Sequence, residues 1–436
     1  MNNKTGSIMH NAIKYITTII GAGAVLDFDY NYQDSIFPSS RNITDYIKNL
    51  KVQDVDNKES DVISKVYHLA CDRLSQIYEK RGICKQYELN FEELYFLLES
   101  LLSYTETGID YLNPYGRSPL SMLVCVRDEL QKYYHVEYER ALTKILKVII
   151  DIIARYDNHF KEFADSEKWY RSFWQGKENI KYDIFTFNYD TTIEQSIEDY
   201  EDGFEIVDNH RDKISAFVPQ KLIHNSKKQS TIQHLHGCIY YAEYPIESGM
   251  IYSHRDFFKI NYVNDTLKSI GLQQNEQTQA RELYMNSPIL VGLRKLDKMT
   301  YMPNSIYHAN LVNALMKNRG LLIVGYSFGD LYVNQLMQRR LLMRGDDHRI
   351  VIIDSFPKSI NSVIDLYRYM YDYQGKMIHF LKPFFNFQFD DNFKLTGVEF
   401  TSYNEPIYSK DHKCMLLICG FKKAVELHAD LIQNFL

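Results

Sequence analysis

Short apolar runs that alternate with helical stretches are the feature that most limits how this chain can fold. Helical stretches are predicted at Asn304–Lys317 and at residues 330–343 and 359–371. The predicted strands are residues 181–187, 230–235, 288–292, 321–325, 349–354 and 377–381. Apolar strands separated by helices indicate a parallel sheet with helices on both faces. The sequence therefore predicts an α/β fold with a Rossmann-like parallel sheet.

An earlier region, residues 42–176, has a different pattern, in which one predicted helix follows another without strands between them. Residues 90–105 carry leucines on one side, and in residues 136–156 apolar residues recur at three- and four-residue steps. We expect these helices to cover one another as a large inserted layer. No Pro/Gly linker or internal repeat interrupts the chain. Residues 1–436 are therefore predicted to form a single α/β domain, with residues 385–436 as a C-terminal extension packed on the core.

Four glycine-rich or polar segments each follow a predicted strand. They are Gly21-Ala22-Gly23 after residues 15–20, Thr186-Phe187-Asn188-Tyr189-Asp190 after 181–185, His234-Leu235-His236-Gly237 after 230–233, and Gly325-Tyr326-Ser327-Phe328-Gly329-Asp330 after 321–324. Ligands of parallel sheets bind beyond the carboxyl ends of the strands. Together the segments supply a backbone cradle, an amide, a carboxylate and an imidazole. This set suits chemistry on a ribose that carries a pyrophosphate.

The first two segments each allow a simpler interpretation. Gly21, Ala22 and Gly23 let the backbone approach a phosphate closely, but the third glycine of the dinucleotide fingerprint is replaced by Leu26. A tight turn without a ligand explains them equally well. Asp190 is either a ligand-facing carboxylate or the N-cap of a following helix.

The histidine segment holds the best candidate for a base. Strand alternation points His234 and His236 to the same side, and Gly237 adds little bulk beside His236. An imidazole near its ordinary pKa of about 6.5 can accept a proton at cellular pH. We predict a catalytic role for His236 and a structural role for His234.

The last segment supports two different enzymes. Gly325-x-Ser327-x-Gly329 between a strand and a helix is the nucleophile-elbow pattern of α/β-hydrolases, and Asp354 and His379 follow in the order of a Ser–Asp–His triad. That alternative leaves the glycine turn and the Asn188 segment without a role. A nucleotide site uses all four segments.

The composition shows no strong charge bias and no transmembrane segment. The 50 basic and 56 acidic residues give a formal net charge of −6, which argues against a general nucleic-acid surface. The longest apolar stretch, around residues 15–26, is too short to span a bilayer. The six cysteines form no Cys-x-x-Cys pair and are expected to be reduced and buried. We therefore expect a cytoplasmic protein with no metal, no membrane partner and no direct nucleic-acid binding.

In chain order, the four segments resemble those of the sirtuin family, and more closely those of its bacterial anti-phage NADase branch. Gly21-Ala22-Gly23 matches the opening glycine turn, and Thr186–Asp190 matches the T-x-N-[IY]-D segment. Leu235-His236-Gly237 matches the catalytic L-H-G, and Gly325–Phe328 with Asp330 looks like the G-[TYF]-S-[LF] nucleotide loop. The chain is also similar to abortive-infection proteins with an N-terminal glycine turn and a late F-N-Y segment. The zinc-binding cysteines of deacylating sirtuins are absent, so the resemblance implies hydrolysis of NAD and not protein deacylation.

The resemblance implies an NAD nucleosidase that cleaves the nicotinamide–ribose bond and depletes cellular NAD in anti-phage defence. His236 would act as the base, and Asn188 would hold the attacking water or a sugar hydroxyl. NAD would be bound by Gly21, Ala22, Gly23, Asp190, Gly325 and Ser327. An unregulated NADase is toxic to its own cell, so the resemblance implies an inactive state. Assembly into a homo-oligomer, or a co-encoded regulatory protein such as an ATPase or nucleotide-sensing subunit, would relieve this inactive state. A catalytically silent nucleotide-sensing subunit is a further alternative.

Overall fold

The computed structural model of the chain describes most of its 436 residues. The described residues are 13–32, 37–80, 86–107, 130, 132–163, 165–208, 214–224, 228–245, 255–274, 283–292, 299, 302–345, 347–372, 377, 379–381, 388–389, 395–396 and 400–436. Two of the six cysteines, Cys84 and Cys125, lie outside them. The other four are free thiols in the interior.

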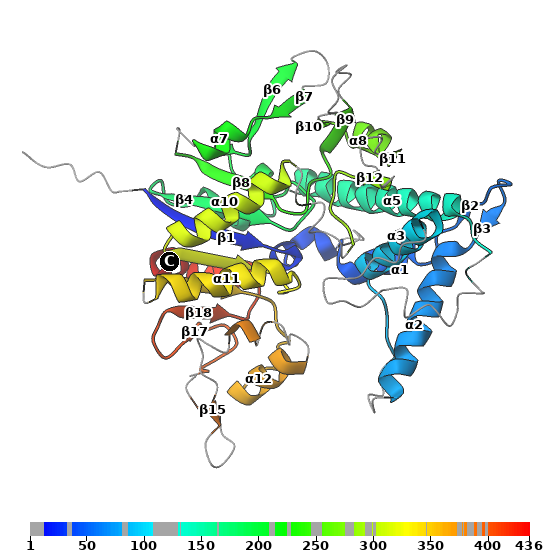
Figure 1. Cartoon of the computed structure of the whole chain (residues 1–436). Coiled ribbons are helices and arrows are strands. Elements are labelled where there is room, and N and C mark those ends of the chain that lie inside the picture. The colour runs from blue at the N-terminus through cyan, green and yellow to red at the C-terminus, as the bar shows by residue number, and fades with distance from the viewer. Residues whose placement is uncertain are drawn as a thin grey trace, which may run out of the picture.

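An eight-stranded sheet organises the molecule (Figure 1). Neighbouring strands are parallel throughout, except that β17 and β18 are antiparallel. In spatial order the strands are β17 (Ile407–Tyr408), β18 (Cys414–Leu417), β14 (Arg349–Ile353), β13 (Gly320–Val324), β1 (Lys14–Ile20), β4 (Ile180–Thr186), β8 (Ser230–His234) and β5 (Tyr200–Glu201). The predicted α/β fold with a Rossmann-like, mostly parallel sheet is confirmed.

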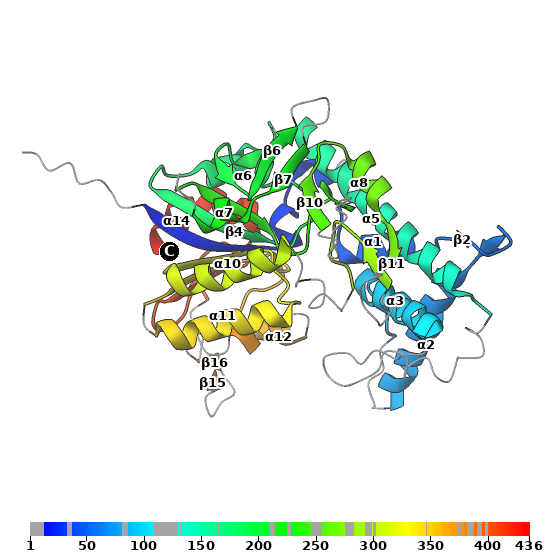
Figure 2. The ribbon, with the colours of Figure 1, turned by 45° about the horizontal axis from the view of Figure 1, so that its top comes forward.

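Helices cover both faces of this sheet (Figure 2). One face carries α10 (Asn304–Lys317) and α11 (Leu331–Arg344), and the other carries α6 (Lys168–Gln175) and α14 (Phe421–Phe435). Alternate residues of β13 belong to the two cores, with Leu321 and Ile323 in one and Leu322 and Val324 in the other. Successive side chains of a strand point to opposite faces, so a strand that is buried on both is apolar throughout.

Two segments that were predicted as strands have other structures. Residues 377–381 are helical where they are described, with Met377, Phe380 and Leu381 buried and His379 exposed. Residues 288–292, all of them described, form only one isolated bridge, between Ile289 and Gly237. The prediction failed because an apolar run of five residues is too short for its periodicity to separate a strand from a helix or a loop.

Between β1 and β4 the chain leaves the sheet and forms a helical layer to one side of it (Figure 1). In α5 (His135–Glu162) the side chains of Leu142, Ile145 and Ile149 are fully buried, at the spacing that the sequence predicted. The helices of the layer pack mainly on one another. The layer contains α1 (Ser40–Ile47), the hairpin strands β2 (Val52–Gln53) and β3 (Glu59–Ser60), α2 (Val62–Lys80), α3 (Phe91–Thr107) and α5 (His135–Glu162).

Smaller elements complete the fold. A second, antiparallel sheet contains β6 (Phe204–Asp208), β7 (Ile214–Phe217), β10 (Arg255–Lys259) and β9 (Tyr241–Pro245) in spatial order. Around the two sheets lie α7 (Pro219–Ile223), α8 (Val263–Ser269), β11 (Gly271–Gln274), β12 (Leu283–Asn286), α12 (Val363–Asp372), β15 (Gln388–Phe389) and β16 (Leu395–Thr396). The C-terminal region supplies β17 and β18 to the main sheet and α14 to one of its faces, so it forms part of the core.

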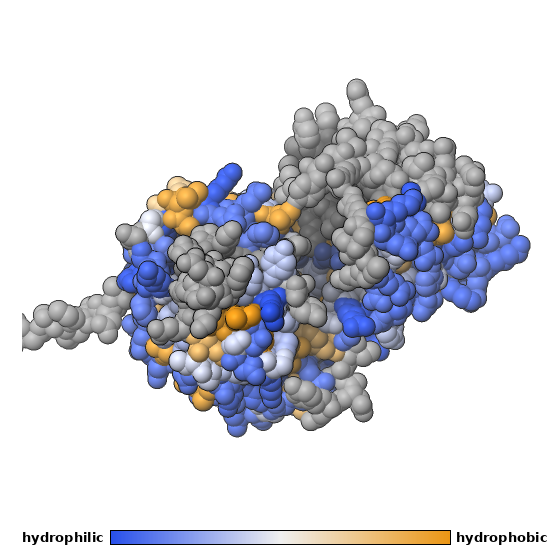
Figure 3. All heavy atoms as spheres, turned by 90° about the horizontal axis from the view of Figure 1, so that it is seen from below, coloured by the Kyte–Doolittle hydropathy of each residue, from blue (hydrophilic) through white to orange (hydrophobic). Residues whose placement is uncertain are grey.

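The described surface has no unusual apolar character. On the face seen in Figure 3, the coloured surface is mostly hydrophilic, with separate hydrophobic areas. Scattered exposed apolar residues are normal on a soluble domain. None of the helices in the described part of the chain combines the length and the apolar character that crossing a lipid bilayer requires.

The loops that follow β1 and β13 touch through their backbones. The N–H of Gly21 donates to the Val324 carbonyl and the N–H of Gly23 to the Gly325 carbonyl, both at 3.0 Å. Gly325 has a φ of +58°, and a Cβ atom there would lie 2.1 Å from the Ala24 nitrogen. A Cβ on Gly21 or Gly23 would also meet the Gly325 backbone, at 2.5 and 2.7 Å. All three positions therefore require glycine for packing, whether or not a ligand binds.

Replacing Gly325 by alanine should destabilise the fold strongly. The substitution adds left-handed backbone strain and a steric clash with backbone atoms, which have no flexible end to move away. We expect the free energy of unfolding to fall by about 3 kcal/mol or more, measured by denaturant titration.

Gly345→Ala is the matched control, because Gly345 has a similar φ of +53° and no atom lies within 4 Å of the place that its Cβ would take. It should lose only the conformational term, about 1–2 kcal/mol. An equal loss of unfolding free energy in the two variants would show that the contact between the loops is not tight.

Candidate active site

The four predicted segments meet at one edge of the main sheet. Strands β13, β1, β4 and β8 are consecutive neighbours and run parallel, so their carboxyl ends lie side by side. The loops beyond them line a cavity of about 1010 Å³, at the upper end of the usual range for cofactor sites. The lining includes all the predicted site residues, which are Gly21, Ala22, Gly23, Asn188, Asp190, His236, Gly325 and Ser327.

The glycine turn supplies part of the cavity floor. It continues from β1 into a short 3₁₀ helix, η1 (Ala22–Val25), which Gly21 caps. The N–H groups of Gly21 and Gly23 are used inside the protein, as described above. These glycines hold the turn against the Gly325 loop, and their predicted role toward a phosphate stays a prediction.

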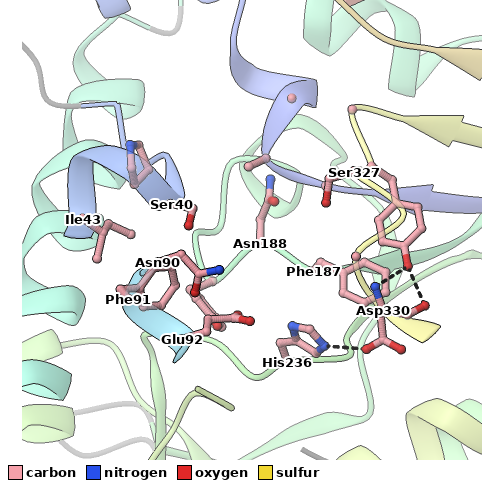
Figure 4. Close-up of a pocket in the computed structure, with 18 of the residues that line it drawn as sticks. Ser40, Ile43, Asn90, Phe91, Glu92, Phe187, Asn188, His236, Ser327 and Asp330 are labelled. Atoms are coloured by element: carbon pink, nitrogen blue, oxygen red, sulfur yellow. Dashed lines mark hydrogen bonds and ion pairs between the residues drawn. The ribbon is translucent and has the colours of Figure 1, made fainter. Parts of the chain in front are cut away.

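Asn188 is fixed through its backbone and points its side chain into the cavity (Figure 4). Its N–H donates to the Thr186 hydroxyl at 3.0 Å, and its carbonyl oxygen lies 3.0 Å from Nδ1 of His234. With both backbone groups held, the carboxamide is presented from a rigid loop to whatever occupies the cavity.

Asp190 lines the cavity and also organises its own loop. One carboxylate oxygen accepts from the Thr192 N–H at 3.1 Å and from the Thr192 hydroxyl at 2.6 Å. Burial, together with the charge of Asp157, raises the pKa of Asp190 to about 6. The α-helix expected directly after Asp190 is replaced by a 3₁₀ turn, η5 (Glu194–Ser196).

His234 is buried behind the loop and is structural, as its sequence context suggested. Its Nε2 lies 2.6 Å from a carboxylate oxygen of Glu194. Burial opposes the charged imidazole, but the Glu194 carboxylate outweighs it and raises the pKa of His234 above the ordinary value. Lys259 completes this buried group of charges, 2.6 Å from Asp202 and 3.9 Å from Glu194.

His236 lies on the cavity wall. Its Nε2 is 3.3 Å from a carboxylate oxygen of Asp330, and the Phe187 ring packs edge-on against it with centroids 4.7 Å apart. Gly237 has a φ of +82°, and a Cβ there would lie 2.1 Å from the Pro288 carbonyl oxygen. The glycine lets the chain turn sharply after the histidine, which stays directed at the cavity (Figure 4).

The opposite wall comes from the helical layer, and the sequence analysis missed it. Ser40 and Ile43 of α1 and the segment Asn90-Phe91-Glu92 at the start of α3 face the strand-end loops (Figure 4). The Asn90 side chain accepts from the Glu93 N–H at 2.9 Å, and the Glu93 carboxylate accepts from the Asn90 N–H at 2.9 Å. This reciprocal capping marks a helix start in sequence, but nothing local indicates which surface that helix start approaches.

The described residues that line the cavity are predominantly acidic. Among the described residues that line it there is no lysine or arginine, whereas five carboxylates are present, from Glu92, Glu93, Asp190, Asp330 and Asp354. Burial raises the pKa of Asp354 to about 7, with the Ser355 N–H opposing the shift and the charge of Asp27 adding to it. The described part of the lining therefore favours a positively charged group, chiefly through Glu92, Glu93 and Asp330.

The structure does not assemble the triad of the serine-hydrolase alternative. Ser327 and Asp354 line the cavity, but His379 is exposed and is not among the lining residues. The non-glycine residue of the loop with a positive φ is Phe328, at +54°, and not Ser327, where a nucleophile elbow needs the strained turn.

Comparisons with known proteins agree with part of the sequence interpretation. Residues 183–371 match the family described as the SIR2-like domain. One matching solved structure, titled "The Structural basis for Sirtuin Substrate affinity", is 10% identical with a TM-score of 0.23, covering 82% of this chain and 92% of that chain. No curated protein matches. Among the described residues, no group of three or more His, Cys, Asp or Glu side chains could hold a metal ion.

The SIR2-like match begins within β4, so it contains the Asn188, His236 and Gly325 segments and excludes the glycine turn and the helical layer. SIR2-like domains bind NAD and include NAD-related enzymes. The region that is similar to the SIR2-like domain, residues 183–371, supplies three of the four loops around the cavity.

Proposed function

We propose that this protein is an NAD hydrolase that cleaves the bond between nicotinamide and ribose. The observation that carries the proposal is the meeting of Asn188 and His236, two polar side chains distant in sequence, at one cavity of dinucleotide size. The SIR2-like match over both residues supports NAD as the ligand. A carboxamide can orient an attacking water and an imidazole can accept its proton, so these two groups suit a hydrolysis at the anomeric carbon.

The charge of the cavity supports this substrate over an ordinary nucleotide. The nicotinamide ring of oxidised NAD is a cation, and the sugar gains positive charge as the ring leaves. Glu92 points toward the space between Asn188 and His236 (Figure 4), so its carboxylate would stabilise positive charge there. The phosphates would lie toward the loop that begins at Gly325 and lines the cavity.

The reaction balances with these groups alone. The bond from C1′ to the ring nitrogen breaks, and its electron pair leaves with neutral nicotinamide. The oxygen of a water molecule, oriented by Asn188, bonds to C1′, and its proton passes to His236. The products are nicotinamide, ADP-ribose and a proton that His236 later returns to solvent.

The biological role we propose is depletion of cellular NAD in anti-phage defence, within the cytoplasm. The motif resemblance supports it, and a freely active NADase would harm its own cell. We therefore propose an off state that assembly into a homo-oligomer, or a co-encoded regulatory protein, releases. The helical layer forms one wall of the cavity, so it is the part through which such a partner could act on the site.

Removing either polar group should abolish NAD loss while the fold persists. General-base catalysis contributes about 10²–10⁴-fold, so we expect His236→Ala to lose at least 10²-fold in kcat, and Asn188→Ala nearly as much. Nicotinamide release, measured by chromatography with the activating partner present, is the assay. Circular dichroism and thermal melting check that each variant is folded.

His379→Ala is the control, because the exposed His379 serves only the hydrolase alternative. Under the NADase proposal this variant keeps wild-type turnover, and a fluorophosphonate probe does not label Ser327. Full turnover in folded Asn188→Ala protein would refute the assignment. Binding of NAD and ADP-ribose by calorimetry without turnover would instead identify a nucleotide-sensing subunit.

The acidic cavity should discriminate against NADP. The extra phosphate of NADP brings about two negative charges into a cavity lined by carboxylates and, among its described residues, by no lysine or arginine. We expect kcat/KM for NADP to be at least about tenfold lower than for NAD, which corresponds to about 1.4 kcal/mol. Raising the salt concentration should narrow the difference. Equal kcat/KM values at low salt would contradict this prediction.

The half-buried carboxyl group of Asp354 should make stability depend on pH in a defined direction. The pKa of Asp354 rises from an ordinary value of 3.8 to about 7 on folding, so the folded protein holds this proton more tightly than the unfolded chain. The stabilisation of the folded protein that comes from this more tightly held proton is complete below pH 3.8, and it is lost as the pH rises through about 7. Asp354→Asn should therefore raise the melting temperature by several degrees at pH 8 and by much less at pH 5.

Asp347→Asn is the control for that experiment, because Asp347 is exposed. Its melting temperature should follow the wild type at both pH values. A gain for Asp354→Asn that is equal at pH 5 and pH 8 would show that the carboxyl group is not the source of the effect.

A further inference from the structure

We propose that Asp330 is a positioning residue that holds the His236 ring in the tautomer with the proton on Nε2, so that Nδ1 faces the cavity as the proton acceptor. The inference rests on the proposed function and deepens it, because it assigns the base to one atom. It also gives Asp330 a role that neither the sequence analysis nor the family match supplies.

Asp330 is itself rigid, because each part of it has a separate partner. It is the N-cap of α11, and one carboxylate oxygen accepts from the Val333 N–H at 3.1 Å. The other oxygen lies 3.3 Å from Nε2 of His236. The hydroxyl of Tyr326 is 3.2 Å from both the backbone N–H and the carbonyl oxygen of Asp330. A carboxylate with so little freedom can fix the ring that it contacts.

The contact with Asp330 decides which ring nitrogen carries the proton. An ionised carboxylate only accepts hydrogen bonds, so the Nε2 beside it must be the donor in neutral His236. The N-terminus of α11 favours the ionised form of its capping residue. The remaining nitrogen is Nδ1, which Figure 4 shows directed into the cavity, toward the side of Asn188 and Glu92. A neutral imidazole in this tautomer has its accepting lone pair where the substrate would lie.

The groups around His236 are consistent with this assignment. Phe187 covers the ring edge-on and carries no charge. His308 on α10 stays neutral, because burial and the nearby His236 lower its pKa to about 4. Described carboxylates on the side of His236 include Asp330 at the start of α11 and, across the cavity, Glu92 at the start of α3. Of these, Asp330 has the contact with the ring.

The same contact couples the base to the nucleotide loop. Tyr326 belongs to the loop that follows β13 and stacks on Phe187 with ring centroids 4.8 Å apart, while Phe187 packs on His236. Asp330 ends that loop. A ligand that orders the loop between Gly325 and Asp330 therefore also orders the ring of His236, so binding and base orientation depend on the same residues.

The test is Asp330→Asn, a change that keeps the helix cap. Asparagine caps helices as well as aspartate, and its side-chain oxygen can still accept from Val333. Its amide can donate to Nε2, which shifts the proton to Nδ1 and removes the accepting lone pair from the cavity. We expect kcat for NAD to fall by at least about 10²-fold while KM changes less than about threefold. In a plot of kcat/KM against pH, the acidic limb should move to lower pH by about one unit. The reason is that the neutral amide no longer stabilises the charged imidazole of His236.

Two further variants distinguish the positioning of the His236 ring from a general disturbance of the fold. Asp330→Ser keeps the cap and forces neither tautomer, so its kcat should lie between those of the wild type and Asp330→Asn. Asp347→Asn, the same chemical change on the exposed C-terminal side of α11, should keep wild-type kcat. Wild-type kcat and an unmoved acidic limb in folded Asp330→Asn protein would overturn the proposal.

A spectroscopic measurement keeps the proposal testable if no NAD hydrolysis is found. In protein labelled with ¹⁵N-histidine, the His236 signals, assigned by their loss in His236→Gln, should report Nε2–H in the wild type and Nδ1–H in Asp330→Asn. An Nδ1–H tautomer in the wild type would sink the assignment of the base. An Nε2–H tautomer without turnover would leave the geometry in place and refute only the proposed function.

Discussion

The backbone contact between the loops after β1 and β13 is the constraint on which the rest of the site depends. These strands are parallel neighbours, so their loops leave the sheet at the same edge and compete for the same space. Glycine at positions 21, 23 and 325 lets the loops pass in contact, with the Gly23 N–H bonded to the Gly325 carbonyl. The glycines therefore have a sufficient structural reason, and they do not by themselves indicate a phosphate. The case for a nucleotide depends on the polar side chains that this contact leaves around the cavity, and on the SIR2-like match.

The strand-end part of the site could be predicted because a parallel sheet brings all carboxyl ends to one edge. Alternating apolar runs indicated β4, β8, β13 and β14, and the polar residues that follow them had to lie near one another. The opposite wall could not be predicted, because the capping pattern at Asn90 and Glu93 marks where a helix begins and not what it faces. The helical structure of Met377, His379, Phe380 and Leu381 was missed for a related reason. Its burial spacing becomes visible only when the packing of neighbouring elements is known.

Buried charges hold the Asn188 loop from two sides. Asp157 of α5 accepts from the Thr191 N–H at 2.7 Å and from the Tyr240 hydroxyl at 3.1 Å, which ties the loop to the helical layer. On the other side His234, paired with Glu194, contacts the Asn188 carbonyl. Burying ionised groups costs several kcal/mol of desolvation that their pairing only partly returns, so such networks add little net stability. They define position instead, and removing one partner leaves an uncompensated buried charge. The loop that carries the carboxamide is thereby fixed relative to both the sheet and the helical layer.

This double attachment bears on how an off state could be built. The sheet side of the cavity is rigid, because the loops after β1, β4, β8 and β13 contact one another or the buried charges behind them. The facing wall, from α1 and α3, belongs to a layer that packs mainly on itself. Under the proposed function, a shift of α1 and the start of α3 relative to α5 would change the distance from Glu92 to the anomeric carbon. Coulomb energy varies with distance, so under the proposed function a partner that binds the helical layer could change the reaction rate without touching the base. The acidic wall, which local sequence patterns gave no reason to expect, is then the part of the site best suited to control.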